Sequence, residues 1–214
     1  MTRLVLVHGV VTGPSAWDPL LPFLEPYDLV VPERPRTGSL DEELSWLASV
    51  AQGAWVVGVS GGATLGLALA ATGVPLAGAV LHEPAVGSLA PGLLAPVAAA
   101  FESWGVVGLG STLYGASWSL DLCPPAAFTT APAELAMFRG FEPSPVSPAA
   151  GKVVVTHGGA SPPARWTAAR ALLPLGCSVR RVPRATHFAP HDHPDDFARV
   201  LRAVVGDLSP QDEE

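Results

Sequence analysis

The stretch from Ala54 to Gly62 constrains the fold more than any other part of the chain. It reads AWVVGVSGG and is followed directly by the helix-like sequence ATLGLALAA, so the predicted order is strand, sharp turn, helix. A serine at the apex of such a turn has a cramped backbone, and the residues two positions before and after it must be small. Both are glycine here, Gly58 and Gly62. The pattern predicts a nucleophile elbow at Ser60, the alternative being a tight turn in which Ser60 only caps the helix.

Composition and charge indicate a single globular domain. Of the 214 residues, 49% are hydrophobic and only 14% are charged, which allows a substantial core and argues against disorder. The net charge is −7, and Lys152 is the only lysine, so we expect no nucleic-acid partner. Residues 1–214 are therefore predicted to form one domain.

Neither a membrane segment nor a metal or disulfide framework is predicted. No apolar run reaches the length of a bilayer span, and the apolar segment Leu4–Val7 has no charged and apolar leader before it. Cys123 and Cys177 are too few for a disulfide framework and have no metal-ligand spacing. We expect a cytoplasmic protein with no membrane partner, a monomer or homodimer that acts on a small molecule without a cofactor.

Apolar runs of strand length alternate along the chain with segments of helical periodicity, which predicts an α/β fold with a mostly parallel sheet. A helix is expected to start at Ser39, where Glu42 completes a capping-box pattern. The other expected helices are a short one over 15–24 that Pro19 and Pro22 interrupt, the segment after Gly62, and 194–205. The expected strands are 4–7, 28–32, 55–59, 76–81, 152–156 and 178–182.

Residues 84–150 interrupt this alternation. The segment contains no convincing strand and many alanines, glycines and prolines, with helices expected near 91–104 and 133–138. It is too long for a plain connection, so we predict a lid inserted over the end of the sheet. Its large apolar side chains either line a pocket beneath the lid or form the lid's own core: Trp104, Leu109, Leu113, Tyr114, Trp118, Phe128, Met137, Phe138 and Phe141.

Five motifs, in order along the chain, together resemble the α/β-hydrolase family and its small, lidded serine esterases. They are LVLVHGVVTGPSAWDPLLPFL, the elbow GVSGG, VLHEP, VVVTHG and THFAPHDHPDDFARVLRAV. The resemblance covers nearly the whole chain outside the lid. The antiparallel hairpin that begins the family fold has no counterpart before Leu4, so the resemblance implies a minimal version with about six strands.

The resemblance implies roles for residues near the strand ends. Ser60 would be the nucleophile, and His187 follows the last strand, where the family carries its catalytic base. The N–H groups of Val10 and Gly61 occupy the places of the family's oxyanion donors. His191 lies close to His187, as does His193, but no glutamate or cysteine upstream completes a metal site at the usual spacing.

The acid of the triad is where the sequence departs from the common pattern. Most relatives have an aspartate shortly after a His-Gly like that at His157, whereas this chain has Ser161 there and no carboxylate from 157 to 175. A hydroxyl cannot supply the charge that stabilises an imidazolium. Glu83, at the end of the preceding strand, keeps the order serine, acid, histidine. The alternatives are a Ser-His dyad or another carboxylate such as Asp192.

These residues predict a serine hydrolase that cleaves a small or medium, largely apolar carboxylic ester or thioester through an acyl-enzyme. Carbon-carbon hydrolysis, hydroxynitrile lysis and perhydrolysis use the same residues and stay open. The missing aspartate leaves a second alternative, a degenerate relative that binds a ligand without turning it over.

Overall fold

The computed structural model describes residues 1–206, and the end of the predicted domain, 207–214, lies outside the described residues. One six-stranded sheet has the order β2-β1-β3-β4-β5-β6, and every neighbouring pair of strands in it is parallel. The predicted α/β class and the mostly parallel sheet are confirmed. The strands are β1 (Arg3–Val7), β2 (Asp28–Val30), β3 (Trp55–Val59), β4 (Gly78–His82), β5 (Lys152–Gly158) and β6 (Ser178–Val182).

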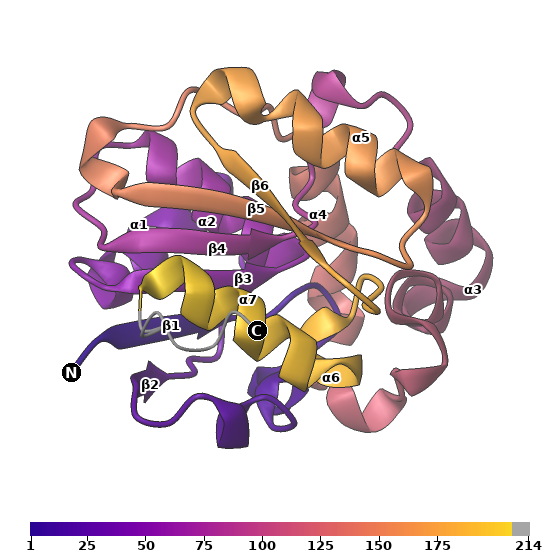
Figure 1. The fold of residues 1–214 in the computed structure, drawn as a ribbon. Helices are drawn as coiled ribbons and strands as arrows, with labels where there is room; N and C mark the ends of the chain where they lie inside the picture. The colour runs from indigo at the N-terminus through magenta and orange to yellow at the C-terminus, as the bar shows by residue number, and fades with distance from the viewer. Residues whose placement is uncertain (207–214) are drawn as a thin grey trace.

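Helices cover both faces of the sheet, as Figure 1 shows. On one face lie α1 (Leu40–Ala51), α2 (Gly61–Ala71) and α5 (Pro163–Ala171), which belong to the larger apolar core. The other face is covered by α7 (Pro194–Val205), which follows the short helix α6 (Ala189–Asp192). Because both faces are buried, the central strands read as continuous apolar runs.

One helical prediction needs correction, and one helix was not predicted. The segment 15–24 does not form one short helix but two 3₁₀ turns, η1 (Pro14–Trp17) and η2 (Leu21–Phe23). Pro19 and Pro22 lie in this segment, and proline has no backbone N–H to donate within a longer helix. The helix α5 was not expected, since four of its nine residues are alanines and two are arginines, so no stripe of large apolar residues marks it.

The segment 84–150, called the insertion below, contains no strand, and the structure describes all of it. Its two long helices are α3 (Ala95–Tyr114) and α4 (Ala127–Arg139), which lie beyond the carboxyl ends of the strands (Figure 1). A kink divides α3 at Gly105, whose φ of 58° is one that glycine readily adopts. The remaining turns of the insertion are η3 (Gly87–Leu89), η4 (Gly115–Ser117), η5 (Leu120–Leu122) and η6 (Pro148–Ala150).

Not all the large apolar residues of the insertion point inward. Trp104 is 75% exposed and Phe128 is 53% exposed, so neither lines a pocket under the insertion. Leu109, Leu113 and Phe138 are buried and line a cavity together with Ser60. The pocket interpretation therefore holds for these three residues, whereas Trp104 and Phe128 fit neither interpretation; Trp118 and Phe141 are buried in the larger apolar core.

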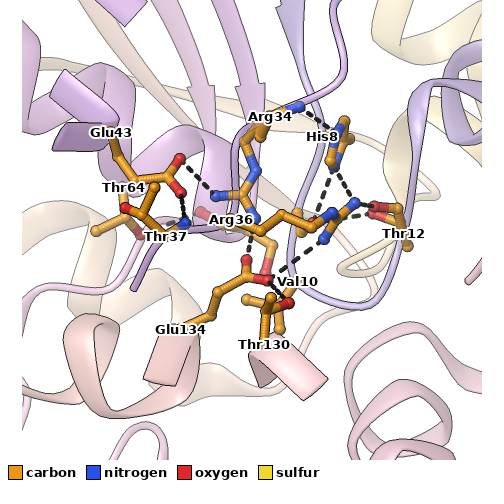
Figure 2. A network of polar contacts seen from close by, with 12 residues as sticks. His8, Val10, Thr12, Arg34, Arg36, Thr37, Glu43, Thr64, Thr130 and Glu134 are labelled. Carbon is orange, nitrogen blue, oxygen red and sulfur yellow. Dashed lines mark hydrogen bonds and ion pairs between the residues drawn. The ribbon is translucent and has the colours of Figure 1, made fainter. Parts of the chain in front are cut away.

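A buried network of ion pairs fixes the insertion to the rest of the chain (Figure 2). Arg34 and Arg36 lie on the loop after β2, and both contact the Glu134 carboxylate on α4. Arg34 also contacts Glu43 on α1, at 3.2 Å between Nη1 and Oε2. All four side chains are almost completely buried. Two cations and two anions balance one another here, which offsets the large cost of removing each charge from water.

Replacing Glu134 with Gln is expected to lower the free energy of unfolding by about 3–5 kcal/mol, because the buried Arg34 then keeps only Glu43 as a carboxylate partner and Arg36 keeps only the half-exposed Glu33. Urea unfolding followed by circular dichroism measures the change. The matched control is Asp28→Asn, which breaks a 2.8 Å ion pair with Arg3 on the surface and should cost less than about 1 kcal/mol. Equal losses in the two variants would contradict the importance of the buried network.

Candidate active site

Ser60 lies at the sharp turn between β3 and α2, with φ 56° and ψ −119°, a conformation that is unusual for a residue with a side chain. A Cβ atom added at Gly58 would lie 2.6 Å from the Ala63 nitrogen, and one at Gly62 would lie 2.0 Å from the Val7 carbonyl oxygen. Glycine is thus required at both positions. The Ser60 side chain makes no capping hydrogen bond to the described helix, so the interpretation of Ser60 as a simple helix cap is wrong.

Glu83 follows β4 directly, and its buried carboxylate binds groups from two other strand ends. Oε2 lies 2.8 Å from His187 Nδ1, on the loop after β6. Oε1 accepts hydrogen bonds from the Gly158 N–H at 2.9 Å and from the Ser161 hydroxyl at 2.5 Å. Ser161, which stands where an aspartate was expected, therefore holds Glu83 in place. Its loop supplies donors rather than the acid.

The electrostatics of this pair keep Glu83 ionised and His187 neutral. Burial acts to raise the pKa of Glu83, but the hydrogen bond from His187 and the nearby His82 and Arg165 hold that pKa far below its usual range. The pKa of His187 is lowered to about 4, first by burial and then by the positive charge of Arg165. Glu83 only partly opposes that effect. A neutral imidazole with a charged partner on Nδ1 is the form that can accept a proton at Nε2.

The structure brings Ser60 and His187 to one cavity but does not join them by a hydrogen bond. His187 Nε2 is buried and has no hydrogen-bond partner among residues 1–206. Both residues line a cavity of about 30 Å³, which Val10 and Gly61 also line. Catalytic hydrogen bonds are often incomplete without substrate and tighten when it binds.

Tyr114, at the end of α3, was expected from the sequence only as one of the large apolar residues of the insertion, and its contacts with the site were not predicted. Its ring stacks on that of His187, with 5.6 Å between the ring centroids, and its hydroxyl donates to the Val10 carbonyl oxygen at 2.9 Å. A Cβ atom on Gly9 would lie 2.1 Å from this hydroxyl and 2.9 Å from Ser60 Cβ, so Gly9 allows the close approach. Burial raises the pKa of Tyr114 to about 12, which keeps the phenol protonated.

The loop after β1, which carries Val10, is held by the insertion. Val11 has a φ of 50°, which is a genuine outlier for a β-branched residue. The Trp118 indole N–H donates to the Val11 carbonyl oxygen at 2.9 Å, next to the hydrogen bond from Tyr114. At the facing side of the cavity, Gly61 begins α2, and the first N–H groups of a helix have no acceptor within it.

Three other polar side chains, those of His8, His191 and Asp192, do not line the Ser60 cavity. His8 is buried and braces the loop, since its Nδ1 lies 3.1 Å from the Gly9 carbonyl oxygen and its Nε2 accepts from the Arg34 N–H at 3.3 Å. Asp192 pairs with His191 at 3.0 Å rather than with His187, so the alternative in which Asp192 is the acid is wrong. Within residues 1–206 no three ligating side chains are grouped to hold a metal ion.

Arg165, on α5, also lines the cavity and was not singled out from the sequence. Its Nε lies 3.4 Å from Glu83 Oε2. A signal was available, because no acidic residue occurs near this arginine in the sequence. Sequence alone could not show that its partner comes from the end of β4.

Comparisons with known proteins agree on one fold. The model of the Alpha/beta hydrolase family matches residues 4–200. The enol-lactonase from Burkholderia xenovorans superposes with a TM-score of 0.73 at 16% identity, over 95% of this chain and 91% of that chain. Carboxylesterase CesB from Bacillus subtilis superposes with a TM-score of 0.68 at 15% identity, over 97% of this chain and 85% of that chain. An alpha/beta hydrolase from Sphaerobacter thermophilus superposes with a TM-score of 0.68 at 22% identity, over 95% of this chain and 92% of that chain.

At these low sequence identities, the structural similarities show a shared fold and nothing more. A search of curated proteins finds no significant match. None of the helices in residues 1–206 is both long enough and apolar enough to cross a membrane.

The protonation of His187 gives a direct test of the electrostatics. In an NMR titration its ring is expected to stay neutral at pH values where a histidine of ordinary pKa, 6.5, is already charged, with its midpoint near pH 4. Arg165→Gln should move the midpoint to higher pH, because a positive charge that disfavours the imidazolium is removed. His187→Gln assigns the resonance, and Arg170→Gln on the same helix is the control. A wild-type midpoint at or above 6.5 would refute the assigned environment.

Proposed function

Since the chain belongs to the alpha/beta hydrolase family, we propose that it is a serine hydrolase that cleaves a small or medium, largely apolar carboxylic ester or thioester. The observation that carries the proposal is the 2.8 Å contact between His187 Nδ1 and Glu83 Oε2, beside a serine at a strained turn in the same cavity. This is the arrangement of base, orienting acid and nucleophile that serine hydrolases require.

In the proposed mechanism the Ser60 hydroxyl attacks the ester carbonyl while His187 Nε2 takes its proton. Glu83 stabilises the imidazolium that forms, and the N–H groups of Val10 and Gly61 bind the negative charge on the carbonyl oxygen. The imidazolium then protonates the leaving alcohol or thiol. Water, activated by the neutral imidazole, attacks the acyl-enzyme and releases the acid, which restores Ser60.

In this proposal the insertion acts as a lid over the site. Its apolar side chains Leu109, Leu113 and Phe138 line the cavity around Ser60, which favours an apolar substrate group and keeps bulk water away. The cavity has little free volume, so a substrate has to displace these side chains to reach Ser60. The alternative of a degenerate binding protein rested on the missing aspartate, and Glu83 offers a carboxylate in its place.

Reaction with a fluorophosphonate tests the proposal without knowledge of the natural substrate. Intact mass spectrometry is expected to find one covalent adduct on the wild type, because the probe labels an activated serine, and none on Ser60→Ala. A short-chain aryl ester should be hydrolysed by the wild type only. Folded wild-type protein that forms no adduct and turns over no ester would overturn the proposed function.

Glu83→Gln separates the triad from a Ser-His dyad. Loss of the acid's charge is expected to lower kcat for an aryl ester by up to about 10⁴-fold, as loss of the carboxylate does in other serine triads. The matched control is Glu102→Gln, an exposed glutamate on α3, which should leave kcat unchanged. A Glu83→Gln enzyme within about threefold of wild type would rule out Glu83 as the acid, since triad acids contribute far more.

A further inference from the structure

A second and larger cavity lies next to the small one around Ser60. It has a volume of about 720 Å³ and is formed between the start of the insertion and the beginning of α5. Almost all the side chains that line it are small or apolar, among them Leu89, Leu93 and Pro96. Val97 and Arg165 line both this cavity and the one around Ser60. These two residues therefore lie on the wall of both spaces.

Arg165 is the only charged side chain among the described residues that line the larger cavity. In the smaller cavity the other charged or titratable groups are Glu83 and His187, which the proposed triad uses. One guanidinium thus lies on the wall of both the larger, otherwise apolar cavity and the small cavity that Ser60 lines. A purely apolar substrate would have no group for the positive charge of Arg165 to bind.

The hydrogen-bonding capacity of Arg165 is unmet by the protein. Its side chain is only 12% exposed, yet its one close polar contact in the described chain is the 3.4 Å approach of Nε to Glu83 Oε2. A guanidinium carries five N–H donors, and none of those of Arg165 is buried without a partner, so the donors that do not face Glu83 are open to solvent or to a ligand. By contrast, the buried Arg34 directs its two Nη groups at two carboxylates.

Glu83 does not need Arg165 to satisfy its carboxylate. Three hydrogen bonds, from His187, Gly158 and Ser161, already reach its two oxygens. The contact with Arg165 is the longest of the four and involves the Nε edge of the guanidinium. The two Nη groups remain available to a ligand.

We propose that Arg165 binds an anionic oxygen group of the substrate, so that the enzyme acts on esters that combine an apolar body with a carboxylate. The apolar part occupies the larger cavity, and the carboxylate accepts hydrogen bonds from the Nη groups of Arg165. Paired N–H donors in a planar fork match the two oxygens of a carboxylate. This inference rests on the proposed function and names the substrate class of the same site.

Matched ester pairs test the inference by the ratio of kcat/KM values for charged and uncharged members. In the first pair, 4-nitrophenyl hemiadipate carries the carboxylate on the acyl chain, and 4-nitrophenyl 6-methylheptanoate is its uncharged isostere. In the second pair, 4-acetoxybenzoate carries it on the leaving group, with 4-isopropylphenyl acetate as the isostere. The wild type is expected to prefer the charged member of at least one pair by about ten- to a hundredfold, the range for a charge-assisted hydrogen bond.

Arg165→Gln is expected to abolish that preference, and Arg165→Lys to retain part of it, because lysine keeps the charge but not the fork. Arg170→Gln is the matched control, since this exposed arginine lies on the same helix and lines neither cavity. Its ratio should equal that of the wild type. A ratio is insensitive to a general loss of activity, so damage to the triad by the Arg165 variants does not mimic the expected result.

The two proposals fail in different ways. If the wild type reacts with the fluorophosphonate and hydrolyses the uncharged esters, but prefers neither charged ester, the proposed function stands and the role of Arg165 is overturned. The same holds if Arg165→Gln keeps the wild-type preference, because Arg165 would then serve only as a counter-ion near Glu83. If neither adduct nor hydrolysis is found, the proposed function falls and the substrate class falls with it.

Discussion

One buried carboxylate organises the carboxyl edge of the sheet. Glu83 leaves the end of β4 and accepts hydrogen bonds from the loop after β5 and from the loop after β6. A buried charge is tolerated only when such partners surround it, so the positions of three strand ends are tied to one anion. The same carboxylate orients the imidazole of His187, which makes the edge of the sheet both a structural junction and the candidate site.

The features that the sequence predicted well depend on short stretches of chain. Gly58 and Gly62 predict the turn at Ser60 because each removes a clash with backbone close by, and the α/β-hydrolase resemblance is confirmed by the family match over residues 4–200. Ser60, Glu83 and His187 each follow a strand of one parallel sheet, so the topology alone gathers them at one edge. Their catalytic roles remain predictions.

The features that the sequence did not predict depend on residues that are far apart in the chain. Tyr114 meets the Val10 carbonyl across 104 positions, and Arg34 meets Glu134 across 100. No local pattern marks such a pair, because hydrophobic periodicity places elements but not the polar groups that meet between them. From the sequence, Ser161 was notable only because it has no charge where relatives have an aspartate. In the structure its hydroxyl donates a hydrogen bond to the carboxylate of Glu83.

The hydrogen bonds from Tyr114, at the end of α3, and from Trp118, just after η4, to the carbonyl groups of Val10 and Val11 hold the loop after β1 against the insertion. The left-handed φ of Val11 is retained at a cost in backbone energy, which these contacts offset while α3 is in place. A displacement of the insertion would remove both hydrogen bonds from this loop. The backbone of Val10, whose N–H the proposed mechanism uses, therefore depends on where the insertion lies.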